Sequence, residues 1–262
     1  MRYDCSVSRY HPRPEPWTRL AIPVVRAVTA VTSRPDYRGR ANLPRRGGVV
    51  LAANHLANVD PVLLARFVLE QGRIPRFLAK HPLFEMPVLG RLLYGAGQIP
   101  VYRGRANAAD ALEDAVAALR HGEVVVIYPE GTFTTDPERW PMTARNGVAR
   151  LALLAGVPVV PVAQWGASKL VGPRGRLHVR RRYSVLVGEP LDPAAWSGAP
   201  GVSAGAAGRD PATLHRLTTE VMTRVRAQLS ELRGSPAPDA VWDPKRGERV
   251  SAGFARRDEA AA

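Results

Sequence analysis

Residues 48–60 of this chain are GVVLAANHLANVD. The first six are glycine or apolar, and such a short uncharged run predicts a strand that is buried on both faces. Asp60 is followed by Pro61, a pair typical of a helix N-cap and first helical position, so we expect a helix from Asp60 to Gln71. A buried strand that passes through a short loop into a helix is typical of an α/β sheet.

The same alternation of strands and helices continues along the chain. Helical segments of 10–15 residues between strands are typical of parallel pairing, because a crossover connection of that length is needed to bring the next strand alongside. We therefore expect a single α/β domain over residues 35–232, with a mixed, mostly parallel sheet flanked by helices. The further strands are expected at 37–41, 76–79, 98–102, 123–128, 157–162 and within 176–187, and the further helices at 86–94, 107–120, 143–155 and 211–232.

Two segments lie outside this predicted domain. In residues 1–34, apolar side chains recur at steps of three and four, which predicts an amphipathic helix over 16–33. Two interpretations stay open: the helix lies in the headgroup layer of a membrane, or it packs on the core. Residues 234–262 carry five cations, five anions and few large apolar side chains, so we expect a disordered tail over residues 233–262. The apolar stripe of the helix consists of Trp17, Leu20, Val24, Val28 and Val31.

The 262-residue chain is strongly basic, with 37 Lys and Arg against 23 Asp and Glu and a net charge of +14. Because the tail is neutral, the charge belongs to residues 1–233. It indicates an anionic partner: nucleic acid, a phospholipid surface or a phosphate-bearing substrate. Cys5 is the single cysteine, which excludes an intrachain disulfide. No pair of His or Cys has the spacing of a metal site, so we expect no metal.

His55 and Asp60 are the first candidates for chemistry. His55 directly follows the predicted buried strand, and Asp60 begins the next helix five residues later. A carboxylate that holds one imidazole nitrogen leaves the other to act as a general base near neutral pH. The alternative also stays open, in which Asp60 only caps the helix and His55 only fills the loop.

Two further strand ends carry groups suited to a phosphate. The strand at 123–128 is followed by Pro129, Glu130, Gly131 and Thr132, where a glycine turn with free N–H groups and a hydroxyl can bind an anion. Arg103 follows the strand at 98–102, and a guanidinium suits a phosphate fork. Taken singly, an ordinary turn and a solvated arginine are the alternatives.

Together and in this order, these segments resemble the 1-acylglycerol-3-phosphate O-acyltransferase family, the glycerophospholipid acyltransferases with an NHxxxxD motif. The motif corresponds to Asn54, His55 and Asp60, followed by Arg103, by residues 129–132 and by the Val-Pro segment at 157–161. Residues 79–90, AKHPLFEMPVLG, are similar to the family's segment between the first two motifs. The resemblance covers roughly residues 35–190.

The resemblance implies acyl transfer from acyl-CoA or an acyl-carrier protein to the free hydroxyl of 1-acylglycerol 3-phosphate, making phosphatidic acid. His55 would be the general base and Asp60 would orient it, with no covalent acyl-enzyme, no metal and no cofactor beyond the acyl donor. It also implies an anionic membrane surface as partner, at the cytoplasmic face of the cell membrane, with peripheral or monotopic attachment. The residues implied to bind substrate are Arg103, Glu130, Gly131 and Thr132, with Lys80 and Asn54 as further candidates.

One departure from the family pattern leaves the identity of the acceptor lipid undecided. The family commonly has an arginine after Glu-Gly-Thr, whereas this chain has Phe133, so that one phosphate contact is missing or is supplied by Arg145. A neighbouring hypothesis is therefore the same chemistry on another lyso-lipid: lysophosphatidylinositol, a lyso-aminolipid or a glycolipid.

Two other classes of function are less well supported by the sequence. A nucleic-acid-binding protein would need aromatic residues among the basic ones on a sheet face, or a known helical module. The most basic run, at 180–183, is RRRY and has neither, so we expect no nucleic-acid partner. An inactive membrane scaffold is disfavoured because His55, Asp60 and Glu130 are all present.

Overall fold

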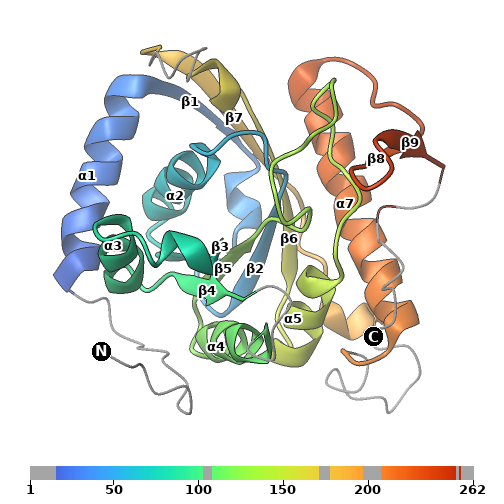
Figure 1. Ribbon diagram of the computed structural model, residues 1–262, viewed down its shortest axis with the longest axis horizontal. Coiled ribbons are helices and arrows are strands. Elements are labelled where there is room, and N and C mark those ends of the chain that lie inside the picture. The colour runs from blue at the N-terminus through green and yellow to red at the C-terminus, as the bar shows by residue number, and fades with distance from the viewer. Residues whose placement is uncertain (1–15, 103–107, 171–177, 197–207, 252–253, 255–262) are drawn as a thin grey trace.

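One seven-stranded sheet, in the order β1-β7-β6-β2-β5-β3-β4, organises the computed structural model (Figure 1). Every neighbouring pair is parallel except β6 and β7, which confirms the predicted mixed, mostly parallel sheet. The structure describes residues 16–102, 108–170, 178–196, 208–251 and 254. The strands are β1 (Ser33–Arg38), β2 (Val49–Ala53), β3 (Pro75–Lys80), β4 (Ile99–Val101), β5 (Val124–Ile127), β6 (Val159–Trp165) and β7 (Arg181–Val187).

Helices cover both faces of this sheet. On one face α2 (Asp60–Glu70) packs on β2, β6 and β7. On the other face lie α4 (Ala108–Arg120), α5 (Gly147–Ala155) and α7 (Pro211–Arg233). All five residues of β2 are buried, because this central strand has a helical layer above and below it. The short helices are η1 (Arg40–Asn42), η2 (His81–Leu83), η3 (Ala167–Lys169) and η5 (Pro193–Trp196).

The predicted N-terminal helix is present as α1 (Pro16–Thr32), which packs beside α2 and α3 (Leu89–Gly95). Its inner side holds Thr29, which is buried, and the Arg26 guanidinium, which donates to the Leu69 carbonyl at 3.2 Å. Val24, Val28 and Val31 of the predicted stripe are instead 55%, 51% and 63% exposed. The alternative in which the stripe packs on the core is therefore wrong for these three valines.

The boundary predicted at residue 34 falls inside a strand, because α1 runs directly into β1 at Ser33. β1 then pairs with β7 along its whole length, so that α1 is attached to an edge strand of the sheet. Among the helices that the structure describes, none combines the length and the apolar character needed to cross a bilayer.

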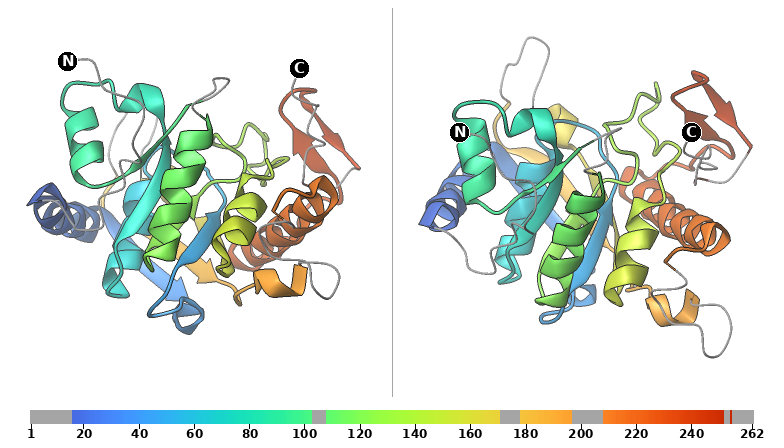
Figure 2. Two further views of the ribbon diagram at one scale, coloured as in Figure 1. Left: turned by 90° about the horizontal axis from the view of Figure 1, so that it is seen from below. Right: turned by 60° about the horizontal axis from the view of Figure 1, so that its bottom comes forward.

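The predicted disordered tail needs a correction. Part of residues 233–262 forms an antiparallel hairpin, β8 (Val241–Asp243) and β9 (Glu248–Val250). The hairpin lies beside the loop that follows β5, and the Thr143 N–H donates to the Trp242 carbonyl at 3.0 Å (Figure 2). The composition of the segment did not predict this hairpin, because contacts with residues about 100 positions earlier stabilise it. Residues 252–253 and 255–262 of the predicted tail lie outside the described residues.

Candidate active site

The carboxyl ends of β2, β5 and β3 meet at one edge of the sheet. β2 and β5 are parallel with Ala52 opposite Ile127, and β5 and β3 are parallel with Phe77 opposite Val126. The registers place His55, Glu130 and Lys80 at this edge, just beyond or at the end of three neighbouring strands. Side chains that are far apart in the sequence are thereby brought together where α/β sheets commonly bind ligands.

The centre of this edge is a hydrogen-bonded pair of His55 and Asp60. The His55 Nδ1 lies 2.9 Å from the Asp60 Oδ2, and the same oxygen accepts the backbone N–H groups of Leu56 and Ala57. The Asp60 side chain is completely buried, whereas 14% of the His55 side chain is exposed. The carboxylate therefore holds the imidazole by its inner nitrogen and leaves Nε2, which has no hydrogen-bond partner among the described residues, for a substrate.

This geometry corrects one detail of the predicted loop. Asp60 is the first residue of α2 and does not cap it; Val59 holds the N-cap position and no side chain caps the helix there. The Asp60 carboxylate instead turns back onto the loop that begins at His55. The short loop thus lets one side chain order both its own backbone and the imidazole.

Two aromatic rings enclose the imidazole. The Tyr128 ring stacks on His55 with centroids 4.1 Å apart and an interplanar angle of 17°. Phe133 approaches edge-on at 5.8 Å and is 42% exposed. Tyr128 was missed by the sequence analysis, because a tyrosine at the end of a buried strand is equally typical of a core residue. Phe133 places an apolar group at the mouth of the site.

Glu130 links the loop after β5 to the loop after β2. One carboxylate oxygen accepts the His55 backbone N–H at 3.0 Å and the other accepts the Met142 N–H at 2.9 Å. Burial raises the pKa of Glu130 to about 8, against the opposing effect of these two hydrogen bonds. The expectation that Glu130 contacts the acceptor stays a prediction. In this structure its two oxygens accept one backbone N–H each and so join the two loops.

Asn54 is also tied into the scaffold. Its side-chain oxygen accepts the Gln164 N–H at 2.8 Å, and its side-chain nitrogen donates to the Gln164 carbonyl at 3.1 Å. Gln164 Nε2 donates back to the Asn54 carbonyl, and the Tyr183 hydroxyl donates to Gln164 Oε1. Asn54 is fully buried in this structure, and its hydrogen bonds join the end of β2 to β6 next to His55. Its expected substrate contact stays a prediction.

The other predicted binding residues that the structure describes lie near the ends of β5 and β3. Gly131 has a φ of 74°, the left-handed conformation that lets the chain turn directly after Glu130. Thr132 is partly exposed, and Lys80 is exposed at the end of β3. Arg145 is exposed, and its N–H donates to the Pro129 carbonyl at 2.9 Å, which places its backbone beside the same turn. Arg103 lies outside the described residues.

The loop over residues 133–142 forms a further wall that the sequence analysis missed. The Thr134 N–H donates to the His55 carbonyl at 2.8 Å. Arg249 of the C-terminal hairpin donates to both oxygens of Asp136 at 3.0 Å, and it pairs with Glu138 at 3.0 Å. No local pattern indicates this wall, because its two halves are joined only in the folded chain.

The arrangement as a whole suits proton abstraction from a hydroxyl. It offers an oriented imidazole, a rigid backbone on both sides of it and cationic side chains nearby that can bind a phosphate. Within the described residues, no three His, Cys, Asp or Glu side chains gather as a metal ion requires.

Comparison with known proteins agrees with this geometry. A family model described as "Acyltransferase" matches residues 34–165, half of the chain, and this segment includes His55, Asp60 and Glu130. The 1-acyl-sn-glycerol-3-phosphate acyltransferase of Borreliella burgdorferi is 29% identical over 131 residues, which are 50% of this chain and 50% of that protein. The enzyme of the same name from Bacillus subtilis is 28% identical over 152 residues, 58% of this chain and 71% of the relative.

A solved structure supports the fold. The crystal structure of the 1-acyl-sn-glycerophosphate (LPA) acyltransferase PlsC from Thermotoga maritima matches with a TM-score of 0.62 and 22% identity. The match covers 84% of this chain and 83% of that one, so the likeness includes the helices around the sheet as well as the central strands. The family model spans half of the chain and includes His55 and Asp60, so this chain belongs to the acyltransferase family.

Proposed function

We propose that this protein transfers a fatty acyl group from an acyl thioester to the free hydroxyl of 1-acylglycerol 3-phosphate, which yields phosphatidic acid. The observation that carries the proposal is the His55–Asp60 pair, 2.9 Å apart, at the sheet edge where the glycine turn and Lys80 also lie. The names of the Borreliella and Bacillus relatives point to the same reaction.

The reaction follows from the chemistry of the pair. His55 Nε2 removes the proton of the acceptor hydroxyl as its oxygen attacks the thioester carbonyl carbon. The tetrahedral intermediate then collapses with cleavage of the C–S bond, and the thiolate leaves with the proton from His55. Asp60 keeps the Nδ1 proton in place and stabilises the imidazolium that forms between these steps.

The acceptor phosphate would lie among the groups at the mouth of the site. Lys80 at the end of β3, Arg103 beyond β4 and Arg145 beside the turn can supply positive charge, and Gly131 and Thr132 can supply N–H and hydroxyl donors. The donor would be acyl-CoA or an acyl-carrier protein, and the proposed reaction needs no metal or other cofactor.

A second candidate acceptor is favoured by Phe133. This side chain occupies the position after Glu-Gly-Thr and meets the His55 ring at 5.8 Å, where an arginine would have faced a phosphate. An apolar group there suits a lyso-lipid whose headgroup is larger or less charged, such as lysophosphatidylinositol, a lyso-aminolipid or a glycolipid.

The proposed location is the cytoplasmic face of the cell membrane, with peripheral or monotopic attachment. The exposed valines of α1, together with Val88 and Leu92 at α3, give an apolar surface that a headgroup layer would cover. A triple variant, Val24→Ser with Val28→Ser and Val31→Ser, should lose flotation with anionic vesicles and keep its fold. Val179→Ser, which removes an equally exposed valine elsewhere, is the control. Full flotation of the triple variant would contradict this location.

One assay tests the reaction. The purified protein on anionic vesicles receives labelled acyl-CoA and, in parallel, lysophosphatidate, glycerol 3-phosphate, lysophosphatidylinositol or a lyso-aminolipid. Product from lysophosphatidate that His55→Ala abolishes supports the main proposal, and product from another acceptor supports the second. If no acceptor gives product with acyl-CoA, the assay is repeated with an acyl-carrier protein as donor. If that donor also gives no product with any acceptor, the proposed function is wrong.

A further inference from the structure

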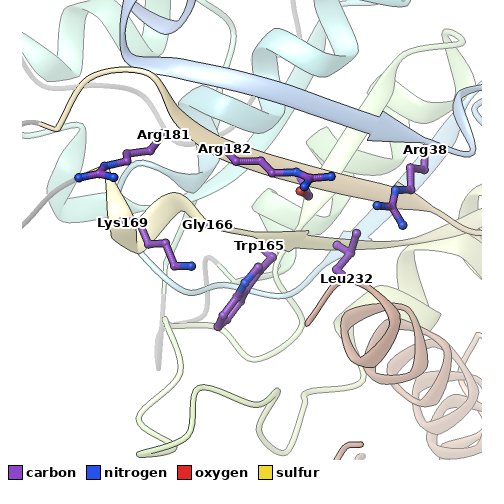
Figure 3. A pocket seen from close by; sticks show the side chains of 8 residues that line it. Arg38, Trp165, Gly166, Lys169, Arg181, Arg182 and Leu232 are labelled. Carbon is purple, nitrogen blue, oxygen red and sulfur yellow. The ribbon is translucent and has the colours of Figure 1, made fainter. Parts of the chain in front are cut away.

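A basic pocket of about 390 Å³ lies between β7, the end of β6 and the end of α7. Figure 3 shows cationic side chains around this hollow, with Arg38 and Arg182 coming from the sheet and Lys169 from η3 across it. The pocket lining consists of Arg38, Trp165, Gly166, Lys169, Arg181, Arg182, Ser184 and Leu232. It holds none of the residues assigned above to proton transfer or to the acceptor.

The positive charge of this pocket is only partly neutralised. Asp36 pairs with Arg182 at 2.7 Å and with Arg38 at 3.4 Å, and Glu231 pairs with Arg38 at 3.5 Å. Lys169 and Arg181 pair with no carboxylate among the described residues. Arg181 precedes Arg182 on β7 and points to the opposite face of the strand. Three cations, Arg38, Lys169 and Arg182, therefore face two carboxylates, and a ligand with several negative charges would complete the balance.

The pocket is next to the scaffold of the candidate active site. Trp165 directly follows Gln164, which hydrogen-bonds Asn54, the neighbour of His55. Arg182 directly precedes Tyr183, whose hydroxyl donates to the Gln164 side chain. The guanidinium of Arg233 lies over the Trp165 ring, 4.7 Å from its centroid, and fixes the indole at the pocket wall. The pocket therefore adjoins, through β6 and β7, the hydrogen-bonded residues that lead to Asn54 beside His55.

The pocket and the exposed valines of α1 lie on opposite faces of the sheet. Tyr37 of β1 packs against Phe67 of α2 at 5.1 Å, and Tyr183 of β7 belongs to the same core. Because side chains alternate along a strand, Arg38 and Arg182 point to the other face. A bilayer that covers α1 would therefore leave this pocket to a molecule that comes from the aqueous side.

We propose that this pocket binds the 3′-phosphorylated ADP group of an acyl-CoA donor, an inference that rests on the proposed function. Guanidinium and ammonium groups would bind the phosphates, and the indole would provide an apolar wall for the purine. The volume is in the range of small-molecule sites and is far larger than one phosphate needs. The pantetheine arm would then extend along the carboxyl edge of the sheet and bring the thioester to His55.

Binding without turnover tests the pocket directly. Free coenzyme A and adenosine 3′,5′-bisphosphate are titrated calorimetrically into the full-length wild-type protein and into Lys169→Ala and Arg182→Ala. We expect each variant to weaken both ligands about tenfold, as the loss of one charge-assisted contact implies. Arg150→Ala, an exposed arginine of α5 outside the pocket, should bind both ligands as the wild type does. Equal affinity in the pocket variants and the wild type would overturn the proposal.

Kinetic and vesicle-binding measurements distinguish the phosphates of coenzyme A from those of a lipid headgroup as the ligand of the pocket. The pocket variants should raise KM for acyl-CoA about tenfold and leave KM for the lyso-lipid acceptor unchanged. A loss of vesicle flotation with unchanged coenzyme A affinity would make the pocket a lipid-headgroup site and overturn the proposal. A wild-type protein that accepts acyl groups from carrier protein alone, and does not bind coenzyme A, would also overturn it. Pocket-dependent coenzyme A binding with no acyl transfer to any acceptor would support the pocket and refute the proposed function.

Discussion

The Glu130 Oε1 accepts the backbone N–H of His55 at 3.0 Å, so the loop after β5 holds the loop after β2 by a direct hydrogen bond. The second oxygen holds Met142 in the same way, and the carboxyl group is buried. A single side chain therefore sets the relative position of the proposed base, the glycine turn and the wall of the site.

Glu130→Gln should weaken this junction in a pH-dependent way. The amide nitrogen cannot accept an N–H, so one buried backbone donor loses its partner and the variant loses about 1–3 kcal/mol of stability. Because burial raises the pKa of Glu130 to about 8, the folded protein keeps a proton that the unfolded chain releases near 4.5. The wild-type free energy of unfolding should therefore fall as pH rises from about 4.5 to about 8, by a component that the variant lacks.

Urea titrations of wild type and Glu130→Gln at pH 5, 7 and 9 measure this component. The stability difference between the two proteins should shrink as pH rises, since only the wild type pays the cost of ionising a buried carboxyl. A difference that stays constant from pH 5 to pH 9 would show that Glu130 is ionised throughout.

Asp60→Asn should reduce kcat by about 10²-fold or more, within the range of general-base catalysis. The Asp60 oxygen accepts hydrogen bonds from the imidazole and from the N–H groups of Leu56 and Ala57. An amide at this position lacks the negative charge of the carboxylate that stabilises the imidazolium. Because Asp60 acts through His55, adding His55→Ala should cause little loss beyond that of His55→Ala alone. Single-turnover rates of the two single variants and the double variant check this, and losses that multiply would argue for independent roles.

Arg249→Ala should lower activity although the residue is far from His55 in the sequence. Arg249 makes two hydrogen bonds to Asp136, whose side chain is 1% exposed, and so anchors the loop whose Thr134 binds the His55 carbonyl. Removing the guanidinium leaves a buried carboxylate without its ion-pair partner, at a cost of about 1–3 kcal/mol. Melting temperature and kcat should both fall.

Arg246→Ala is the matched control for this prediction. Arg246 lies in the turn between β8 and β9 and is exposed, with Asp243 4.0 Å away. It should leave both quantities close to wild type, as expected for an exposed pair. Equal effects of the two substitutions would assign the loss to surface charge and not to the loop.

Phe133→Arg should improve the use of a phosphate-bearing acceptor. The new guanidinium would stand beside the glycine turn, and one charge-assisted hydrogen bond would lower KM for lysophosphatidate about tenfold. Phe133→Leu, which keeps an apolar group, should not lower it. Steady-state kinetics with lysophosphatidate and lysophosphatidylinositol check the change, and an unaltered ratio of the two KM values would exclude residue 133 from acceptor recognition.

The α/β class and the positions of the main elements could be predicted from local patterns in the sequence. Buried strands such as β2 and β5 are short, uncharged and rich in valine, and their pattern is local. The pairing of His55 with Asp60 was likewise predictable, since a five-residue separation across a short loop leaves little choice of geometry. The helical spacing of Val24, Val28 and Val31 also predicted α1 correctly.

The contacts of these side chains could not be predicted before the fold was known. Asn54 belongs to the NHxxxxD motif and Glu130 to the segment at 129–132, yet Asn54 binds the backbone of β6 and Glu130 that of Met142, which no spacing in the sequence reveals. The hairpin at 241–250 has too little apolar surface to be predicted as ordered, and it is held by Arg249 on Asp136, 113 residues away. Such contacts depend on strand order and burial, and these are properties of the whole packed chain.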